Sequence, residues 1–379
     1  MDYRLQWMTG LCAADFPRDA YARLQAQVPQ ATPFNQLGWL QAAERALEPG
    51  QELQVLLAWA GDELRLCLPL VCARERRFGL RWTVLRHLGH PLSDRIALLC
   101  RLDADGRRQV RTAIRRHLPH ALLQLHELVE GGEQEALLED WAAASSTHER
   151  RPSCRVPVHA IDEGDRREPS GDLRYKLRRA RKRAAACNAR VQRLTPDGAS
   201  IGAALEAIAA IEQASWKGEQ GVGIFSGERR RQWMHEAFGA LATAGLVRIV
   251  LLEHQGRCIS YRLGLLERGR LYDYNLAFLP EYAELGSGRL LLDEWIRWGL
   301  EDGWQWIDAS RVSLQGSSHQ LHERMTGELL QLRWSFYSWR PDGIALGLAH
   351  RLWSAVKARR LQSAEQPPRS SGERPCPAE

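Results

Sequence analysis

The feature of the sequence that most constrains the fold is a series of three β-like segments that ends in a glycine turn. The segments are Leu246–Glu253, Cys258–Leu266 and Leu271–Phe278, and each is rich in aliphatic, β-branched or aromatic residues. The links between them, HQGR and ERGR, are short and contain glycine, which favours β-hairpins. The series therefore predicts an antiparallel meander of three strands.

The residues around the meander predict three helices and one further strand. From Ser287 to Glu301 apolar side chains recur at helical spacing, and Gly303 provides a stop. Trp304–Asp308 is again β-like. Upstream, Leu205–Ala214 and Trp233–Leu241 predict two helices. The whole order is helix, helix, meander, glycine turn, helix and strand.

The turn itself, Gly286-Ser287-Gly288-Arg289, has the composition of a phosphate-binding site. Glycines allow positive φ and a close approach of the backbone to a ligand. Free N–H groups at a helix start, together with the helix dipole, attract phosphate oxygens, and Arg289 adds a positive charge. The alternative interpretation is a tight strand-to-helix turn without a ligand.

The first half of the chain repeats this order weakly. Trp39–Leu47 predicts a helix, Val55–Trp59 and Leu64–Cys72 predict a hairpin, and Trp82–Leu88 predicts a third strand. Where the second half has ELGSGR, the first half has HPLSDR. We infer an internal duplication in which only the second copy keeps a phosphate-binding turn. The alternative is a chance recurrence of hairpins, which are common in αβ proteins.

Composition divides the chain into a first domain, a linker, a second domain, and a C-terminal helix with a tail, at 1–155, 156–172, 173–345 and 346–379. The stretch 151–172 is rich in proline, glycine and charge, which is typical of a linker. From Ser363 onward apolar residues are almost absent, so we expect disorder there.

The net charge of +6 over 379 residues suits an anionic ligand but does not by itself indicate nucleic acid. The N-terminus lacks the basic start and apolar stretch of a signal peptide, and no apolar run approaches the roughly 18–20 residues of a transmembrane segment. We therefore expect a cytoplasmic protein. The eight cysteines are scattered without CxxC pairing or metal-ligand spacing, which favours reduced thiols and no bound metal.

The order of elements resembles the GNAT superfamily of acyltransferases. In that family the segment R/Q-x-x-G-x-G/A grips the pyrophosphate of coenzyme A. Gly286 and Gly288 match its glycines, whereas Ala283 stands at its first position. The chain is most similar to a branch that includes acetyltransferases associated with cellulose and exopolysaccharide biosynthesis and that is related to Fem-type transferases. The resemblance spans roughly 33–340 and is carried by 33–47, 66–80, 85–99, 173–186, 214–225 and 271–308.

The resemblance implies an α/β (α+β) fold of tandem GNAT-like domains, with mixed, mostly antiparallel sheets flanked by helices. It implies an N-acyltransferase that moves an acyl group from acetyl-CoA or another acyl-CoA to a small-molecule or carbohydrate amine, in cell-envelope polysaccharide biosynthesis. Coenzyme A would contact Gly286, Ser287, Gly288 and Arg289. The backbone of Leu276–Phe278, which includes Ala277, would face the thioester carbonyl.

The candidate catalytic residues are Asp273, its neighbour Tyr274, and Asp308. Either carboxylate could accept a proton directly or through water, and Glu253 is a further carboxylate at a strand end. For each carboxylate the alternative is a strand end that is solvated or ion-paired.

The general acid stays unassigned. Members of the superfamily often carry a tyrosine acid after the last core strand, but no tyrosine occurs there before Tyr337. Ser310, Ser313 and His319 are the substitutes that the sequence offers. His319 and His322 would share one helix face as a metal pair, but no third ligand is in view.

Two further segments are candidates for binding the acceptor or a macromolecular partner. Trp216 and Lys217 precede a glycine-containing loop and are interpreted as a wall of the acceptor pocket; alternatively, Trp216 caps the core and Lys217 is solvated. The basic helix 173–186 is either a solvated face or the contact for an anionic partner, such as a phosphorylated lipid, a membrane surface or tRNA. Nucleic acid is disfavoured because only Tyr175 interleaves with the charges.

Two other functions compete with the acyl-CoA-dependent enzyme. A Fem-type transferase would take an aminoacyl group from charged tRNA, although the helical arm typical of those enzymes is not evident. A non-catalytic GNAT-like protein would bind an anionic partner. The departure at Ala283 and the missing tyrosine acid favour that third function.

Overall fold

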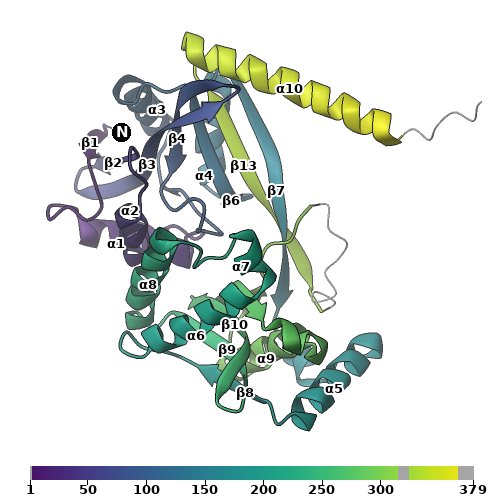
Figure 1. Cartoon of the computed structure of the whole chain (residues 1–379). Coiled ribbons are helices and arrows are strands. Elements are labelled where there is room, and N and C mark those ends of the chain that lie inside the picture. The colour runs from purple at the N-terminus through teal and green to yellow at the C-terminus, as the bar shows by residue number, and fades with distance from the viewer. Residues whose placement is uncertain (1, 315–323, 366–379) are drawn as a thin grey trace, which may run out of the picture.

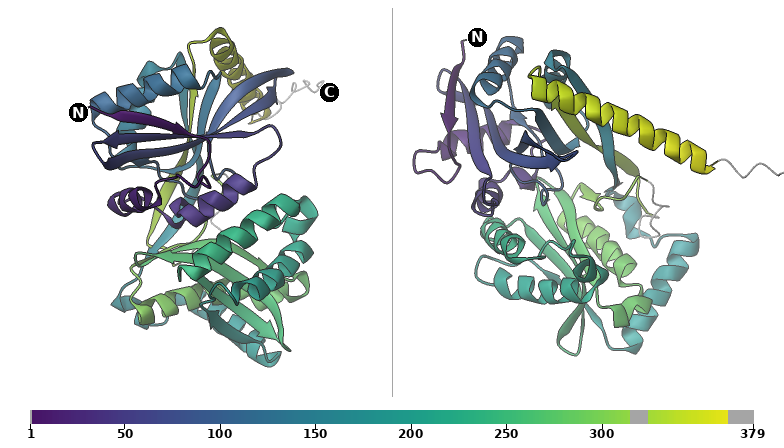
Figure 2. Two further views of the ribbon diagram at one scale, coloured as in Figure 1. Left: turned by 90° about the vertical axis from the view of Figure 1, so that its left-hand side faces the viewer. Right: turned by 45° about the horizontal axis from the view of Figure 1, so that its top comes forward.

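The computed structural model describes residues 2–314 and 324–365, and its strands join one mixed sheet that has helices on both faces (Figures 1 and 2). The elements of the first half, in chain order, are β1 (Arg4–Met8), α1 (Arg18–Gln27), α2 (Leu37–Arg45), β2 (Glu52–Ala60), β3 (Glu63–Arg77), β4 (Leu80–His87), β5 (Leu99–Cys100), α3 (Ala104–His117), β6 (Leu122–Val129), α4 (Gln134–Ala144) and β7 (Thr147–Ala160).

The second half begins with the basic helix and ends with a long terminal helix. Its elements are α5 (Gly171–Ala186), β8 (Arg190–Leu194), α6 (Ile201–Ala214), α7 (Trp216–Gln220), α8 (Glu228–Thr243), β9 (Val247–His254), β10 (Arg257–Glu267), β11 (Arg270–Phe278), η3 (Pro280–Leu285), α9 (Ser287–Asp302), β12 (Trp306–Asp308), β13 (Gly327–Tyr337) and α10 (Pro341–Glu365).

The strand order of the sheet is symmetric when it is followed from its two ends. It runs β1-β2-β3-β4-β6-β13-β7-β12-β11-β10-β9-β8, with β5 beside β3. Each meander is antiparallel, whereas β4 pairs with β6, and β11 with β12, in parallel over three residue pairs. The same topology therefore occurs twice, which supports the duplication inferred from the sequence.

The two copies exchange their last strands. β7 follows the first copy in sequence but pairs with β12 of the second, and β13 follows the second copy but pairs with β6 of the first. β7 and β13 also pair with each other along eleven positions, which closes the sheet at its centre. In Figure 1 these two long strands run from the upper half of the molecule to the lower half.

The exchange corrects one expectation about the linker. Residues 151–160, which composition assigns to a linker, belong to β7, and only the residues between Ala160 and Gly171 connect two elements. Apolar Cys154, Val156 and Val158 stand at every second position among prolines and charged residues, and all three are buried. That short alternation is the strand signal, and the surrounding composition conceals it. The division into domains otherwise stays a prediction.

The halves meet where α2 packs against α8. Gly38 has no room for a larger residue, because a Cβ atom there would lie 2.6 Å from the Cβ of Ala240. Next to it, Trp39 is completely buried among Trp233, Phe238 and Tyr274 of the second half. This aromatic cluster continues the core of one half into that of the other.

The predicted elements of both meanders are confirmed. The helices and strands expected at 39–47, 55–59, 64–72, 82–88, 205–214, 233–241, 246–253, 258–266, 271–278, 287–301 and 304–308 appear as α2, β2, β3, β4, α6, α8, β9, β10, β11, α9 and β12, with bounds that shift by a few residues. The fold class, an α/β fold with a large mixed sheet flanked by helices, is confirmed as well. At the C-terminus, residues 363–365 belong to α10 rather than to a disordered tail, and 366–379 lie outside the described residues.

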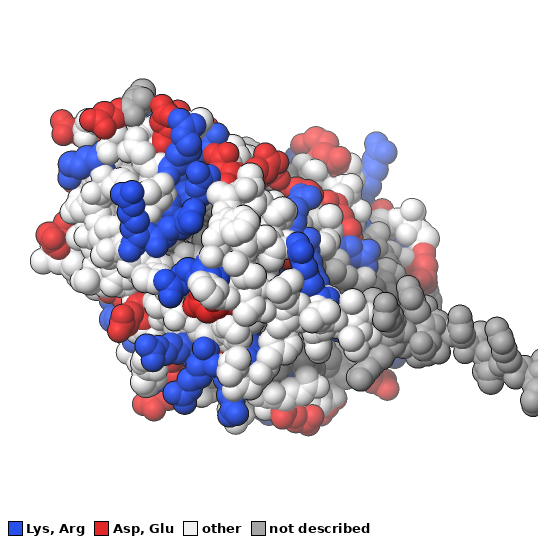
Figure 3. Space-filling model, turned by 90° about the horizontal axis from the view of Figure 1, so that it is seen from above, with Lys and Arg blue, Asp and Glu red and all other residues white. Residues whose placement is uncertain are grey.

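Helix α10 packs only its first turns against the body and then projects from it (Figure 1). Viewed from above, uncharged surface extends from the body toward the grey C-terminal residues, and Lys and Arg side chains lie along it (Figure 3). Within the described residues, none of the helices combines the length and the apolarity that crossing a bilayer requires.

Candidate functional site

The glycine turn has the geometry that the sequence predicts. Gly286 adopts a left-handed conformation with φ of 71°, and α9 begins at the next residue, Ser287. Gly288 and Arg289 form the first turn of α9 and are half-buried. Backbone N–H groups at this helix start therefore lie near the surface, where they can meet an anion.

The basic helix α5 lies beside this turn. A Cβ atom on Gly286 would stand 3.5 Å from the Cβ of Ala180, and the guanidinium of Arg183 donates to the carbonyl oxygen of Glu284. Arg178, Arg179 and Lys182 are exposed, and no described residue forms an ion pair or hydrogen bond with them. Helix α5 thus adds unpaired positive charge near the start of α9.

Strands β11 and β12 diverge directly after their short ladder. They pair only from Arg270 to Tyr272, whereas β11 continues to Phe278 in contact with β10. Among the described residues, none forms a ladder with the edge of β11 from Asp273 onward on the β12 side. Leu276, Ala277 and Phe278, the predicted contacts of the thioester, lie on this unpaired stretch.

Asp273 lies beneath the glycine turn in a completely buried ion pair with Arg262. The same guanidinium donates to the carbonyl oxygen of Gly288, over 3.2 Å from Nε and 3.1 Å from Nη2. Burial raises the pKa of Asp273, and Arg262 opposes that rise. The pair links the sheet to the first turn of α9, which makes Asp273 a positioning residue for the turn. Arg262 is not evident from the sequence as a site residue, because it lies in an apolar strand.

Asp308 ends β12 at the point where the two strands diverge. It is 1% exposed and is paired with Arg95, which comes from the first half. Burial outweighs this cation and raises the pKa of Asp308 to about 6. The backbone N–H of Ser310, which has a φ of 73°, donates to the same carboxylate over 3.1 Å.

A polar cluster surrounds this carboxylate at the junction of the halves. Arg95 also contacts Asp94 at 3.3 Å, and Arg311 bridges Asp94 at 3.5 Å and Glu127 at 3.2 Å. Glu127 is buried at a β-bulge of β6 with φ of 55°, and burial raises its pKa. Ionisable groups and strained backbone of this kind concentrate at functional sites. Asp94 and Arg95 belong to HPLSDR, so the first copy supplies charges to the second.

Lys217 enters the same region from α7. Its ammonium group donates to Asn275 Oδ1 over 2.6 Å and to the carbonyl oxygen of Leu276 over 2.8 Å. Burial lowers the pKa of Lys217, while the nearby carboxylate of Glu212 opposes that shift. The interpretation of Lys217 as a solvated side chain is therefore wrong. Its bond to Leu276 places a cation on the unpaired stretch of β11.

The other residues proposed from the sequence have different surroundings. Tyr274 is buried, and its hydroxyl donates to the carbonyl oxygen of Leu92 over 2.8 Å, so the phenol bridges the halves. Ser313 is exposed. His319 and His322 lie outside the described residues. In the described ranges no three histidine, cysteine or acidic side chains gather as metal ligands.

Two cavities border the junction. One of about 260 Å³ lies between α2, α8 and the segment 86–91, and Arg86, Arg229, Arg230 and Trp233 contribute to its lining. Another, of about 210 Å³, lies between α6 and the residues that follow α7. The glycine turn lines neither, so a ligand at the turn would contact half-exposed backbone rather than an enclosed pocket.

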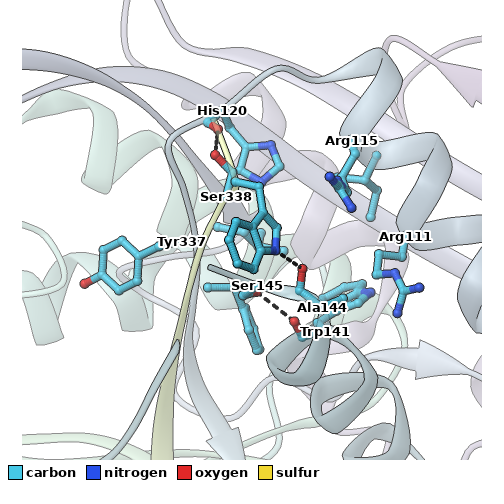
Figure 4. Close-up of a pocket in the computed structure, with 12 residues that line it drawn as sticks. Arg111, Arg115, His120, Trp141, Ala144, Ser145, Tyr337 and Ser338 are labelled. Atoms are coloured by element: carbon cyan, nitrogen blue, oxygen red, sulfur yellow. Dashed lines mark hydrogen bonds between the residues drawn. The ribbon is translucent and has the colours of Figure 1, made fainter. Parts of the chain in front are cut away.

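A separate cavity of about 50 Å³ lies between α3, α4 and the end of β13. Figure 4 shows Arg111 and Arg115 of α3 on one side of it, opposite Ser338 at the end of β13. Trp141, Phe336 and Trp339 make most of its surface apolar. It contains none of the proposed catalytic or donor-binding residues.

Comparison with known proteins identifies the second half. Residues 171–318 match the family model described as an acetyltransferase (GNAT) domain. This range contains the meander, the glycine turn and β12. No curated protein sequence matches the chain.

Solved structures with the same fold extend over both halves. FemX superposes with a TM-score of 0.55 at 10% identity, covering 87% of this chain and 97% of its own. L-PGS from Bacillus licheniformis gives 0.52 at 12% identity, covering 89% and 96%. The C-terminal domain of a putative lysylphosphatidylglycerol synthetase from Agrobacterium fabrum gives 0.54 at 8%, covering 88% and 95%. At these identities the likeness concerns the fold alone.

Proposed function

We propose that this chain, an acyltransferase whose residues 171–318 form a GNAT domain, transfers an acyl group from acyl-coenzyme A to an amine. The divergence of β11 from β12 beside the glycine turn is the observation that supports this most. A thioester in the opening would meet unpaired backbone of β11 beyond Tyr272. The diphosphate would meet N–H groups at the start of α9, with the charges of α5 nearby.

In the proposed reaction the amine attacks the thioester carbonyl carbon, a C–N bond forms, and the C–S bond breaks as the thiolate leaves. Backbone N–H groups of Leu276–Phe278 stabilise the oxyanion. The carboxylate of Asp308 takes the proton that the amine loses, because a pKa of about 6 leaves it ionised and basic at neutral pH. Lys217, bonded to the carbonyl oxygen of Leu276, supplies a positive charge beside the backbone that would face the thioester.

The acceptor is proposed to be a small molecule or carbohydrate that carries an amine. The 260 Å³ cavity between the halves would receive it, since this cavity borders Leu88–Pro91, the residues that precede Asp94 and Arg95. Arg86 and Arg229 of this cavity are ion-paired with Glu75 and Glu48, and the charge of Arg230 favours an acceptor that also carries a negative charge. A role in polysaccharide assembly is part of this proposal.

An aminoacyl donor is the second candidate. The exposed and unpartnered Arg178, Arg179 and Lys182 of α5 favour it, because they could neutralise the phosphates of a tRNA end.

Calorimetric titration separates the two donors. Acetyl-CoA should bind with one site per chain, and acetylpantetheine, which lacks the diphosphate, should bind far more weakly. Binding of charged tRNA in place of acetyl-CoA would favour the second candidate. If neither donor binds, the proposal of a transferase site at this turn is wrong.

A further inference from the structure

Between Ile344 and Val356 the outward face of α10 is apolar, although nothing in the described chain covers it. In an α-helix each residue is rotated by about 100° from the one before it. This rotation places on one half of the helix circumference Ile344, Leu348, Leu352, Trp353 and Val356. All five are exposed, Leu352 by 69% and Trp353 by 52%. A long helix that exposes this much apolar surface indicates an interaction site.

The opposite face holds α10 against the body. Gly347 lies close to Tyr337 and Thr147 of the sheet, and His350 Nδ1 is 2.8 Å from the hydroxyl of Tyr337. Ser354 accepts a hydrogen bond from Arg151 over 2.9 Å. The helix is therefore fixed in rotation, and its apolar half must point away from the body.

Cations border the apolar face on both sides. By the same helical geometry, Arg351 lies at one margin and Lys357 at the other, where its ammonium stacks on the ring of Trp353 at 5.4 Å. Figure 3 shows this side of the molecule, with Lys and Arg side chains along uncharged surface. An apolar face with basic margins is typical of helices that lie in a membrane interface.

The surface next to α10 continues this pattern. Phe78, 48% exposed, packs against His350 at a ring distance of 5.0 Å, and Leu80 beside it is 61% exposed. At the base of the helix, a hollow of about 200 Å³ is lined by Arg115, His120, Ser338, Trp339 and Arg340. Its two guanidinium groups suit a phosphate, and the exposed Trp339 has the amphipathic ring typical of interfaces.

We propose that α10, together with Phe78, Leu80 and Trp339, lies in the surface of an anionic lipid bilayer. The apolar face enters the acyl-chain boundary, and the marginal cations meet lipid phosphates. In this arrangement α10 lies along the bilayer surface, so the proposed attachment is peripheral. A second copy of the chain fits this face less well, since symmetric packing would bring Arg351 and Lys357 of two molecules together.

Vesicle flotation with the full chain tests the proposal. The chain should float with vesicles of phosphatidylcholine that contain phosphatidylglycerol, and weakly or not at all with phosphatidylcholine alone. Leu348→Glu/Leu352→Glu should lower the partition coefficient by about tenfold or more, because two charges would enter the apolar boundary. Arg351→Gln/Lys357→Gln should remove most of the preference for the anionic vesicles.

The matched control is Arg18→Gln/Arg23→Gln in α1, which is remote from α10 and lowers the net charge by the same two units as the double glutamate variant. It should float like the unmodified chain, and circular dichroism should confirm that all variants fold. Equal flotation of the control and the Leu348→Glu/Leu352→Glu variant would overturn the proposal. So would a dimer in solution that the same double substitution dissociates while no vesicles bind.

Discussion

Replacing Gly288 by aspartate separates a ligand-binding turn from a purely structural one. Gly288 lies in the first turn of α9, where its carbonyl oxygen accepts from Arg262 and its Cα is half-buried. A carboxylate at a helix start is favourable by about 0.3–1 kcal/mol through the helix dipole. Loss of a helical glycine adds a few tenths of a kcal/mol in the same direction. The Gly288→Asp variant should thus fold with an unchanged or slightly higher Tm.

Donor binding should respond in the opposite sense. Two unit charges about 4–6 Å apart repel each other by roughly 3–4 kcal/mol at the effective dielectric constant of a protein surface. A carboxylate beside the diphosphate should therefore weaken acetyl-CoA binding by about 100- to 1000-fold. Calorimetric titration at low salt measures this change directly, and added salt should reduce it.

Gly288→Asn is the control because asparagine has the same shape without the charge. It should lose much less affinity than the aspartate variant, and acetylpantetheine should bind both variants equally. Equal losses for aspartate and asparagine would point to a steric effect. Unchanged acetyl-CoA affinity in Gly288→Asp would refute the placement of the diphosphate at this turn.

Three further substitutions probe the site. The pKa of Asp308 is about 6 in the folded chain and about 3.8 in the unfolded chain, so folding becomes less favourable as the pH rises from 4 to 6. Over that range the stability of the unmodified chain, compared with that of Asp308→Asn, should fall by roughly 3 kcal/mol in thermal melts. If Asp308 is the base, kcat/KM should also fall below about pH 6, and the asparagine variant should lack that limb. Arg262→Met leaves the buried carboxylate of Asp273 unpaired and should lower the free energy of unfolding by about 3–5 kcal/mol, as measured by denaturant unfolding. Adding Asp273→Leu removes the unpaired carboxylate and should restore a large part of that loss. Lys217→Met should lower kcat by about tenfold or more and Tm only slightly, and Lys217→Arg should retain part of the activity; equal kcat in both would contradict the assigned role.

The local elements of this protein could be predicted because each meander carries its own signals. Alternating apolar residues and glycine-containing links define β9, β10 and β11, and Gly303 ends α9 in the left-handed conformation that its position predicts. β13 follows a long segment, 309–326, rather than a short glycine-containing link to a neighbouring strand, and its partner β7 looks like a linker in composition. Their pairing depends on contacts between residues about 170–190 positions apart, which no local pattern encodes.

The candidate site was predictable only where backbone conformation determines it. Glycine is needed at Gly286 for its positive φ, so the turn is visible in the sequence. Arg262 lies in an apolar strand and Arg95 in a loop of the other half, so the sequence does not show which carboxylate either arginine pairs with. A carboxylate such as Asp308 is visible in the sequence, but its burial and its pKa depend on a cation that the fold supplies from more than two hundred residues away.

The duplication explains why the two copies contribute different chemistry to one site. In the second copy a short connection, 279–286, leads from β11 to α9 and keeps the glycine that exposes backbone N–H groups. In the first copy the corresponding connection, 88–103, is longer: Ser93 accepts a hydrogen bond from Trp39 of the same half, and Arg95 reaches the other half to pair with Asp308. The first copy therefore has no glycine turn at the position where it supplies Arg95 to the buried carboxylate of Asp308, and the second copy has the turn but takes this cation from the first.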